Sequence, residues 1–156
     1  MISQERRAEK YNQKSTLILI TGERDSGKKP FAKKLEARLF EDDKLVYFLG
    51  VGNILYGVDS DIKGQSDSRQ EHIRRLAEVA HILLDAGIIL IVTAIKLTQD
   101  DLELIETIIN TDRIVVIWTG ESVTTDISYD IKIGEGADMN HLIEMVRTEI
   151  QKKDIF

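Results

Sequence analysis

The sequence predicts an α/β fold with a mainly parallel five-stranded sheet and helices on both faces, and two observations support this prediction. Continuous apolar runs of strand length recur along the 156 residues. Between them lie longer segments whose apolar residues follow the helical period. Parallel neighbouring strands need crossover connections, so this alternation indicates a three-layer arrangement with helices covering the sheet on both sides.

The predicted strands are mostly apolar without alternation, which is typical of strands buried on both faces of a sheet. The first, STLILIT, ends at a glycine. The last is short and is predicted to lie at an edge. The five strands are predicted at residues 15–21, 44–50, 88–95, 113–118 and 130–133.

Helices are predicted between these strands. The clearest covers residues 69–87 and ends at Gly87, a residue that suits the left-handed position after a helix. The closing helix has Asp138 as its N-cap, since a short acidic side chain can accept a hydrogen bond from the first turn. The closing helix is predicted at residues 138–153. Two further helices are predicted at residues 30–40 and 98–110, and the second of these is expected to end at Asn110.

The chain is expected to hold one folded domain. Residues 1–14 are predicted to be an N-terminal arm that is helical over part of its length, and residues 15–156 a single domain. Residues 51–68 are rich in Gly, Asp and Ser and are predicted to form a loop.

Composition excludes several classes of function. A net charge of −6 argues against nucleic-acid binding, which needs a basic surface. The absence of cysteine excludes disulfides, thiolate metal sites and a cysteine nucleophile. The polar N-terminus is no secretory signal, and the longest apolar run is far too short to span a membrane. We therefore expect a cytoplasmic protein that binds neither nucleic acid nor membranes.

The loop after the first strand, ITGERDSGKKP, resembles the phosphate-binding loop of a P-loop NTPase-like fold. It joins a predicted strand to a predicted helix, where backbone N–H groups and the helix N-terminus can receive phosphate oxygens. The candidate nucleotide phosphate-binding residues are Gly22, Arg24, Ser26, Gly27, Lys28 and Lys29.

The same loop departs from the working pattern. Lys29 occupies the position of the Ser or Thr that holds Mg²⁺, and Pro30 disfavours helical backbone at Lys29. Glu23 and Asp25 bring negative charge to a loop for anions, which weakens binding unless they point away or contact a metal. Two interpretations stay open: a site for a nucleotide or anion, and a strand-to-helix turn that keeps two glycines for its geometry.

The segment SRQEHIRRLAEVAHILLDAGIILIVTAI, residues 68–95, resembles the adenylylsulfate kinase segment written DRxENIRRxAEVAxLxxDAGxIxIxSxI. The arm resembles the lead-in to this kinase domain where it is fused behind the GTPase subunit of sulfate adenylyltransferase. The resemblance covers roughly residues 2–151. It implies a P-loop domain that moves the γ-phosphoryl of ATP, with Mg²⁺, to the 3′-hydroxyl of adenylylsulfate (APS). It also implies a GTPase subunit or domain as a partner.

Carried over by position, the resemblance makes Arg69 and His72 substrate-binding candidates, although His72 replaces an Asn. Several family positions are changed. Gly50 and Gly52 replace two aspartates, and the second of these aspartates is the family's base and metal partner. Leu55 replaces an APS-binding arginine. Gly64 and Gln65 replace a Phe-Ser pair. A basic lid segment, about KGLYxKARxG, is missing between the last two strands. Here residues 119–130 cross directly to the last strand.

Three hypotheses follow. The first is an adenylylsulfate-kinase-like domain with weak or no kinase activity and a structural, docking or regulatory role, in which ATP with Mg²⁺ is not held for catalysis. The second is an active P-loop kinase for APS or another small alcohol, with a rearranged site in which Asp59 or Asp61 approaches the metal. The third is a module that binds an adenine nucleotide or sulfated nucleotide without reaction.

Overall fold

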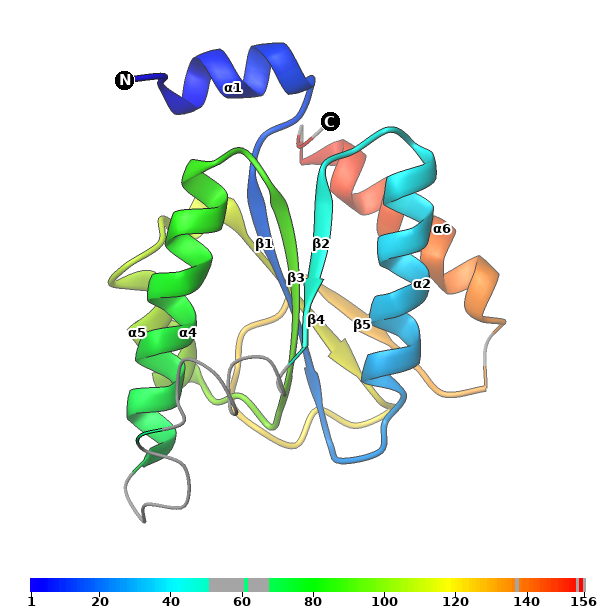
Figure 1. Ribbon diagram of the computed structural model, residues 1–156. Helices are drawn as coiled ribbons and strands as arrows, with labels where there is room; N and C mark the ends of the chain where they lie inside the picture. Colours follow the sequence, from blue (N-terminus) through cyan, green and yellow to red (C-terminus); the bar gives the residue numbers. More distant parts are fainter. Residues whose placement is uncertain (51–60, 62–67, 137, 154, 156) are drawn as a thin grey trace.

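The sheet of the computed structural model is parallel throughout, as predicted (Figure 1). The structure describes residues 1–50, 61, 68–136, 138–153 and 155. Within these residues the strand order is β2-β3-β1-β4-β5, so β2 and the short β5 form the two edges. The strands are β1 Thr16–Gly22, β2 Val46–Leu49, β3 Ile89–Ile95, β4 Ile114–Thr119 and β5 Ile131–Ile133.

Helices cover both faces of the sheet (Figure 1). α2 (Lys28–Glu41) and α6 (Met139–Lys152) pack on one face, and α4 (Ser68–Asp85) and α5 (Gln99–Glu106) pack on the other. The central strand β1 is buried along its whole length because it contributes side chains to both cores. The continuous apolar runs in the sequence are explained by this two-sided burial.

The predicted caps are found at two helices. Asp138 is the N-cap of α6, and its carboxylate accepts a hydrogen bond from the N–H of Asn140. Gly87 follows α4 with a φ of +95°, in the left-handed region. An added Cβ at Gly87 would lie 2.9 Å from the Tyr11 ring, so glycine is needed there for space as well as for backbone geometry.

The predicted end of the acidic helix at Asn110 is wrong. α5 ends at Glu106, where the Thr107 hydroxyl bonds back to the carbonyl of Leu104. Asn110 instead precedes a short 3-10 turn, Thr111–Arg113. The β-branched residues after Glu106 favour helix only weakly, and the chain turns toward β4 at this point.

The N-terminal arm forms the helix α1 (Gln4–Tyr11), which lies across the end of the sheet where the strands begin (Figure 1). Just after it, the buried Gln13 amide bonds to the N–H and C=O of Leu45 and to the C=O of Gly87. The arm is therefore joined to the starts of two strands by side-chain hydrogen bonds. The β1–α2 loop lies at the opposite end of the sheet.

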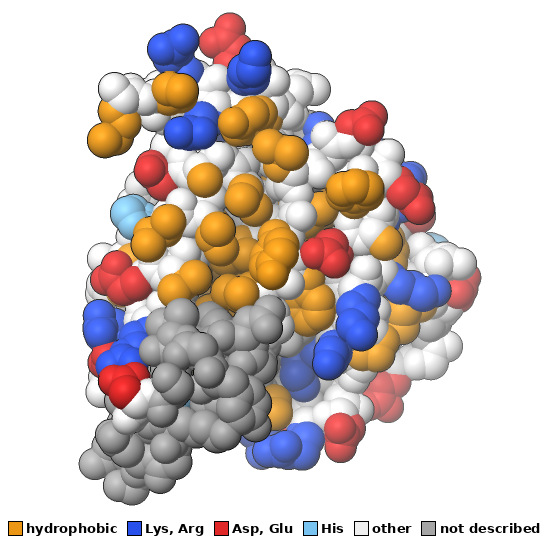
Figure 2. Space-filling view, in the orientation of Figure 1, with side chains coloured by type: hydrophobic (Ala, Val, Ile, Leu, Met, Phe, Trp, Pro, Cys, Tyr) orange, Lys and Arg blue, Asp and Glu red, His pale blue; other side chains and the backbone are white. Residues whose placement is uncertain are grey.

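The surface shown in Figure 2 carries apolar side chains over β2 and α4. Leu45, just before β2, and Tyr47, within it, are both exposed. Lys and Arg side chains gather near the start of α2 in the same view. In the described part of the chain, no helix combines the length and the apolar character that crossing a membrane requires.

Candidate functional site

A cavity of about 960 Å³ opens at the carboxyl ends of the strands, between the β1–α2 loop, β2, β3 and the start of α4. Ligands of open α/β sheets bind at this end of the strands. The described lining includes five of the predicted phosphate-binding residues and both predicted substrate-binding residues. They are Arg24, Ser26, Gly27, Lys28, Lys29, Arg69 and His72.

The remaining predicted residue, Gly22, lies under the loop and does not line the cavity. An added Cβ there would lie 2.4 Å from the carbonyl oxygen of Thr119 and 2.9 Å from the Ser26 hydroxyl. Glycine is therefore needed at position 22 so that the loop can pack against the end of β4.

The backbone turns into α2 through two left-handed residues, Asp25 (φ +61°) and Gly27 (φ +84°). Gly27 is the N-cap of α2 and supplies no side-chain cap, so the first N–H groups of the helix are left to solvent or to a ligand. The loop thus keeps the strand–turn–helix geometry that can receive a phosphate.

Lys28 is the most buried charged side chain of the loop, with 8% of its surface exposed. Its ammonium group donates to the Glu23 carbonyl and, at 3.3 Å, to the Ser26 hydroxyl. Burial lowers the pKa of Lys28, an effect that the charges of Asp25 and Glu23 oppose. Its charge is held beside the phosphate loop and has no ion-pair partner among the described residues.

Glu23 does not line the cavity, although it belongs to the loop. One carboxylate oxygen accepts a hydrogen bond from the Thr124 hydroxyl, and the other lies 3.3 Å from the Lys96 ammonium. The hydrogen bond from Thr124, together with Lys96, lowers the pKa of Glu23. Its negative charge is therefore neutralised away from the position of a bound anion.

The predicted backbone conflict between Lys29 and Pro30 is wrong. α2 begins at Lys28 and runs through both residues without a break. Proline is tolerated in a first turn because its missing N–H would have no partner there. The first helical bond comes from Phe31, whose N–H donates to the Gly27 carbonyl. Burial of Phe31 against the sheet stabilises this start.

Arg69 lies at the start of α4 and reaches across to the next crossover. Its guanidinium donates to the Asp101 carboxylate at 2.8 Å and to the Lys96 carbonyl at 3.3 Å. The same Asp101 oxygen accepts from the N–H of Thr98 and completes the capping box of α5. Arg69 is thus held at the rim of the cavity by a residue that also caps a helix.

One wall of the cavity is apolar, and sequence reasoning missed it. In the sequence, Ile73 and Leu76 follow the helical period of the helix predicted over residues 69–87, a pattern that indicates core packing and not a binding site. A sequence signal for this wall exists, because apolar residues continue to the carboxyl ends of β2 and β3. However, β2, β3 and α4 are distant in the sequence, and their apolar side chains come together only in the folded chain. The apolar lining consists of Phe48, Leu49, Ile73, Leu76, Val92, Ala94, Ile95 and Leu97.

The described lining fits a divalent cation poorly. Its only carboxylate is the exposed Asp25, and Lys29 brings a positive charge to the position after Lys28. Among the described residues there is no group of three His, Cys, Asp or Glu side chains that could hold a metal. Asp61, one of the predicted metal partners, instead pairs with Arg75 at 2.5 Å.

The chain from β4 to β5 contains no helix or strand and lies against the phosphate loop. The Thr119 hydroxyl is 2.6 Å from that of Ser26, and Thr124 bonds to Glu23. Trp118 is fully buried in the core, where its indole N–H donates to the Ser122 carbonyl. The crossover is therefore attached to the loop through side chains.

Several predicted departures lie outside the described residues. Gly50 lines the cavity, and an added Cβ there would meet no atom within 4 Å. Neither the second glycine in an aspartate position nor the replaced APS-binding residues belong to the part of the chain that the structure describes. The positions concerned are Gly52, Leu55, Gly64 and Gln65, and Asp59, the other predicted metal partner, also lies outside the described residues.

The family model described as adenylylsulphate kinase matches residues 14–134. A Clostridium acetobutylicum protein named adenylyl-sulfate kinase is 41% identical over 95 residues, which are 61% of this chain and 48% of that protein. A Clostridium kluyveri protein of the same name is 34% identical over 116 residues, which are 74% of this chain and 58% of that protein. The chain thus spans only about half or slightly more of the length of these curated relatives.

Solved structures share the fold. A cysteine-to-alanine mutant of the Mycobacterium tuberculosis APS kinase CysC gives a TM-score of 0.79 at 22% identity, over 89% of this chain and 99% of that chain. The same kinase in complex with AMPPNP and APS gives 0.74 at 19% identity, with the same coverage of both chains. The predicted P-loop NTPase-like α/β fold is confirmed by this likeness.

Proposed function

Because this chain belongs to the adenylylsulphate kinase family, we propose that it serves sulfate activation by binding an adenine nucleotide or APS in the cavity, with weak or no phosphoryl transfer. The observation that supports binding most directly is that the nearly buried Lys28 and a wall of apolar side chains line the same cavity. A phosphate would lie against the ammonium and the open helix N-terminus. The adenine ring would pack against the wall.

Weak transfer follows from the parts of the site. Phosphoryl transfer depends on positioning and on stabilising charge, so few groups carry it and each is expensive to lose. The loop offers Lys29 in place of a hydroxyl, and Gly50 offers no carboxylate. Removal of one such stabilising group costs about 3 kcal/mol of transition-state energy.

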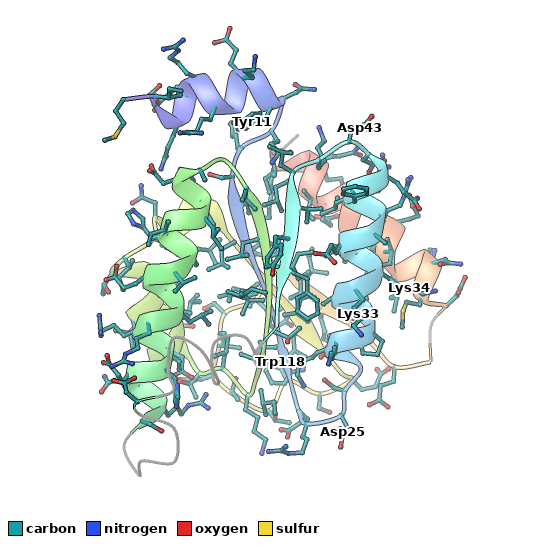
Figure 3. The ribbon with its side chains drawn as sticks, viewed as in Figure 1. Tyr11, Asp25, Lys33, Lys34, Asp43 and Trp118 are labelled. Atoms are coloured by element: carbon teal, nitrogen blue, oxygen red, sulfur yellow. The ribbon has the colours of Figure 1, made fainter. Side chains whose placement is uncertain are left out.

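Thermal-shift and calorimetric titrations with ADP and APS test the binding, since a ligand bound only by the folded state raises stability. We expect saturable binding that Lys28→Ala abolishes. Lys34→Ala is the matched control, because Lys34 is exposed on the same helix and does not line the cavity (Figure 3). Binding that survives Lys28→Ala unchanged, or no binding of either nucleotide at millimolar concentration, contradicts the proposal.

An active kinase with a rearranged site is the second candidate, and the names of the curated relatives favour it. Lys28, Lys29 and Arg24 would then stabilise the transferred phosphoryl group. A coupled assay with ATP, Mg²⁺ and APS separates the two functions. Turnover within the usual range of the family, lost in Lys28→Ala, would establish the kinase and overturn weak transfer.

A docking role beside a GTPase subunit of sulfate adenylyltransferase is a further part of the proposal. It is supported by the resemblance of the N-terminal arm to the linker of fused proteins. Copurification of the two proteins from the cytoplasm, and its loss when residues 1–10 are deleted with Gln13 kept in place, tests this role, provided that thermal unfolding shows the shortened chain to be folded. Intact association without the arm would contradict docking through this segment.

A further inference from the structure

The family reaction uses ATP with Mg²⁺, and the described donor set does not fit that metal. We propose that the cavity instead binds the phosphate chain of a free nucleotide without a divalent cation, and that Lys29 supplies the positive charge in place of the metal. This inference rests on the proposed function, namely that the cavity binds an adenine nucleotide.

The charge balance of the lining supports an anion that carries its full charge. The described lining holds four cationic side chains, Arg24, Lys28, Lys29 and Arg69, against the single carboxylate of Asp25. Arg69 is already paired with Asp101, which leaves Arg24, Lys28 and Lys29 to face a bound anion. The whole chain has a net charge of −6, so this concentration of positive charge is local. Mg²⁺ neutralises part of the phosphate charge, and a nucleotide without it is attracted more strongly to such a site.

The position of Lys29 adds to this balance. It is the second residue of α2, directly after Lys28, and its side chain is exposed where the cavity meets solvent. The N-terminus of α2 already carries partial positive charge. A cation bound between Lys28 and Lys29 would be repelled by both ammonium groups and by the helix. A phosphate oxygen there would be attracted by all three.

The nearby carboxylates are already used elsewhere. Glu23 is held by Thr124 and Lys96, and Asp101 is shared between Arg69 and the cap of α5. Each would have to give up these bonds before it could coordinate a metal. In the described portion of the site, only Asp25 could approach a cation without breaking a bond to a neighbouring cation.

Calorimetric titration with ATP, in EDTA and in excess Mg²⁺, tests the inference. We expect the wild-type chain to bind ATP in EDTA at least as tightly as in Mg²⁺. Lys29→Ser should weaken binding in EDTA about tenfold, since a hydrogen bond to a charged group is lost. Mg²⁺ should then improve the affinity of this variant, because serine can ligate the metal.

Two variants serve as controls. Lys29→Arg keeps the charge and should keep binding in EDTA. Lys34→Ser removes the same charge from an exposed position outside the lining and should leave both affinities unchanged. Thermal unfolding of each variant checks that the fold is retained.

The outcomes separate the two proposals. Wild-type binding of ATP only in the presence of Mg²⁺ overturns metal-free binding and leaves the proposed function standing. A Lys29→Ser variant with the wild-type response to EDTA overturns the role of Lys29. Absence of ATP, ADP and APS binding under both conditions overturns the proposed function itself, and this inference with it.

Discussion

The hydroxyl groups of Ser26 and Thr119 lie 2.6 Å apart, so a side-chain hydrogen bond joins the phosphate loop to the end of β4. Thr119 also lies 3.2 Å from the carbonyl of Thr21, and Lys28 donates to Ser26. The buried lysine, the loop and the crossover that follows β4 are thus connected through three neighbouring polar side chains.

Thr119→Val is expected to lower the free energy of unfolding by about 2 kcal/mol, because the hydroxyl's hydrogen bonds with Ser26 and with the Thr21 carbonyl are both lost with little change in shape. ATP affinity should also fall, since Ser26 loses the partner that orients it beside Lys28. Urea denaturation and calorimetry measure the two effects. Thr107→Val is the control, because the exposed Thr107 hydroxyl bonds only within its own turn. Equal values for Thr119→Val and wild type would contradict the connection.

Lys28 makes nucleotide binding depend on pH. Burial lowers its pKa, so its ammonium loses a proton at a lower pH than an ordinary lysine, whose pKa is about 10.4. ATP affinity should therefore weaken as the pH rises through this lowered pKa. Calorimetry across alkaline pH measures the effect, and an affinity that stays constant until ordinary lysines titrate would contradict it.

Protonation of Lys28 should also make folding stability depend on pH, and stability should rise with pH where ATP affinity falls. The unfolded chain holds the Lys28 proton more tightly than the folded chain, so the unfolding free energy rises with pH between the lowered and the ordinary pKa. Lys28→Met should remove this rise. Urea denaturation of both proteins at several alkaline pH values compares the slopes, and identical slopes would exclude a contribution from Lys28.

Arg69 is expected to bind APS more strongly when it is released from Asp101, which lies 2.8 Å away. Asp101→Asn removes the charge but keeps an oxygen for the Thr98 N–H, so α5 should remain capped. APS affinity should rise severalfold, and it should fall in Arg69→Ala. Arg74→Ala is the control, since Arg74 pairs with Glu71 and does not line the cavity. An unchanged affinity in Arg69→Ala would remove this residue from the site.

Two glycines near the cavity should respond oppositely to substitution. Gly50→Asp should fold normally, because an added Cβ meets no atom within 4 Å, and in a Lys29→Ser background it should strengthen the Mg²⁺ dependence of ATP binding.

Gly22→Ala should destabilise the fold by about 1–3 kcal/mol, because its Cβ would clash with Thr119. Thermal unfolding compares the two, and a stable Gly22→Ala protein would show that the loop can move.

Gln13 should matter for stability and not for binding. Its buried amide makes three hydrogen bonds to the backbone of Leu45 and Gly87, at the end of the sheet remote from the cavity. Gln13→Ala should cost about 2–3 kcal/mol, because buried backbone groups lose their partners. Urea denaturation measures this loss, with the exposed Gln151→Ala as the control. A loss of ATP affinity in the folded Gln13→Ala protein would contradict the separation.

Much of the fold could be predicted because the relevant signals are local. Apolar runs and helical periods located every described strand and the principal helices, and Asp138 and Gly87 marked helix ends correctly. The end of α5 was placed too late because apolar periodicity continues past Glu106 after the helix has stopped. The prediction that Pro30 disfavours helix at Lys29 considered only the local preference of the residue before a proline. In the structure, packing of Phe31 against the sheet stabilises the helix start.

The succession of strands and helices along the chain, the phosphate-loop pattern and the family resemblance are all visible in the amino-acid sequence, because each depends on residues close together in the chain. The three-dimensional fold was needed to show that the Glu23 carboxylate turns toward Thr124 and Lys96, and that Arg69 is held by Asp101. The fold also places Leu76 in the lining of the cavity. These relationships depend on residues tens of positions apart: the packing of β1 between β3 and β4 brings Glu23 to Thr124 and Lys96, and the packing of α4 beside α5 brings Arg69 to Asp101.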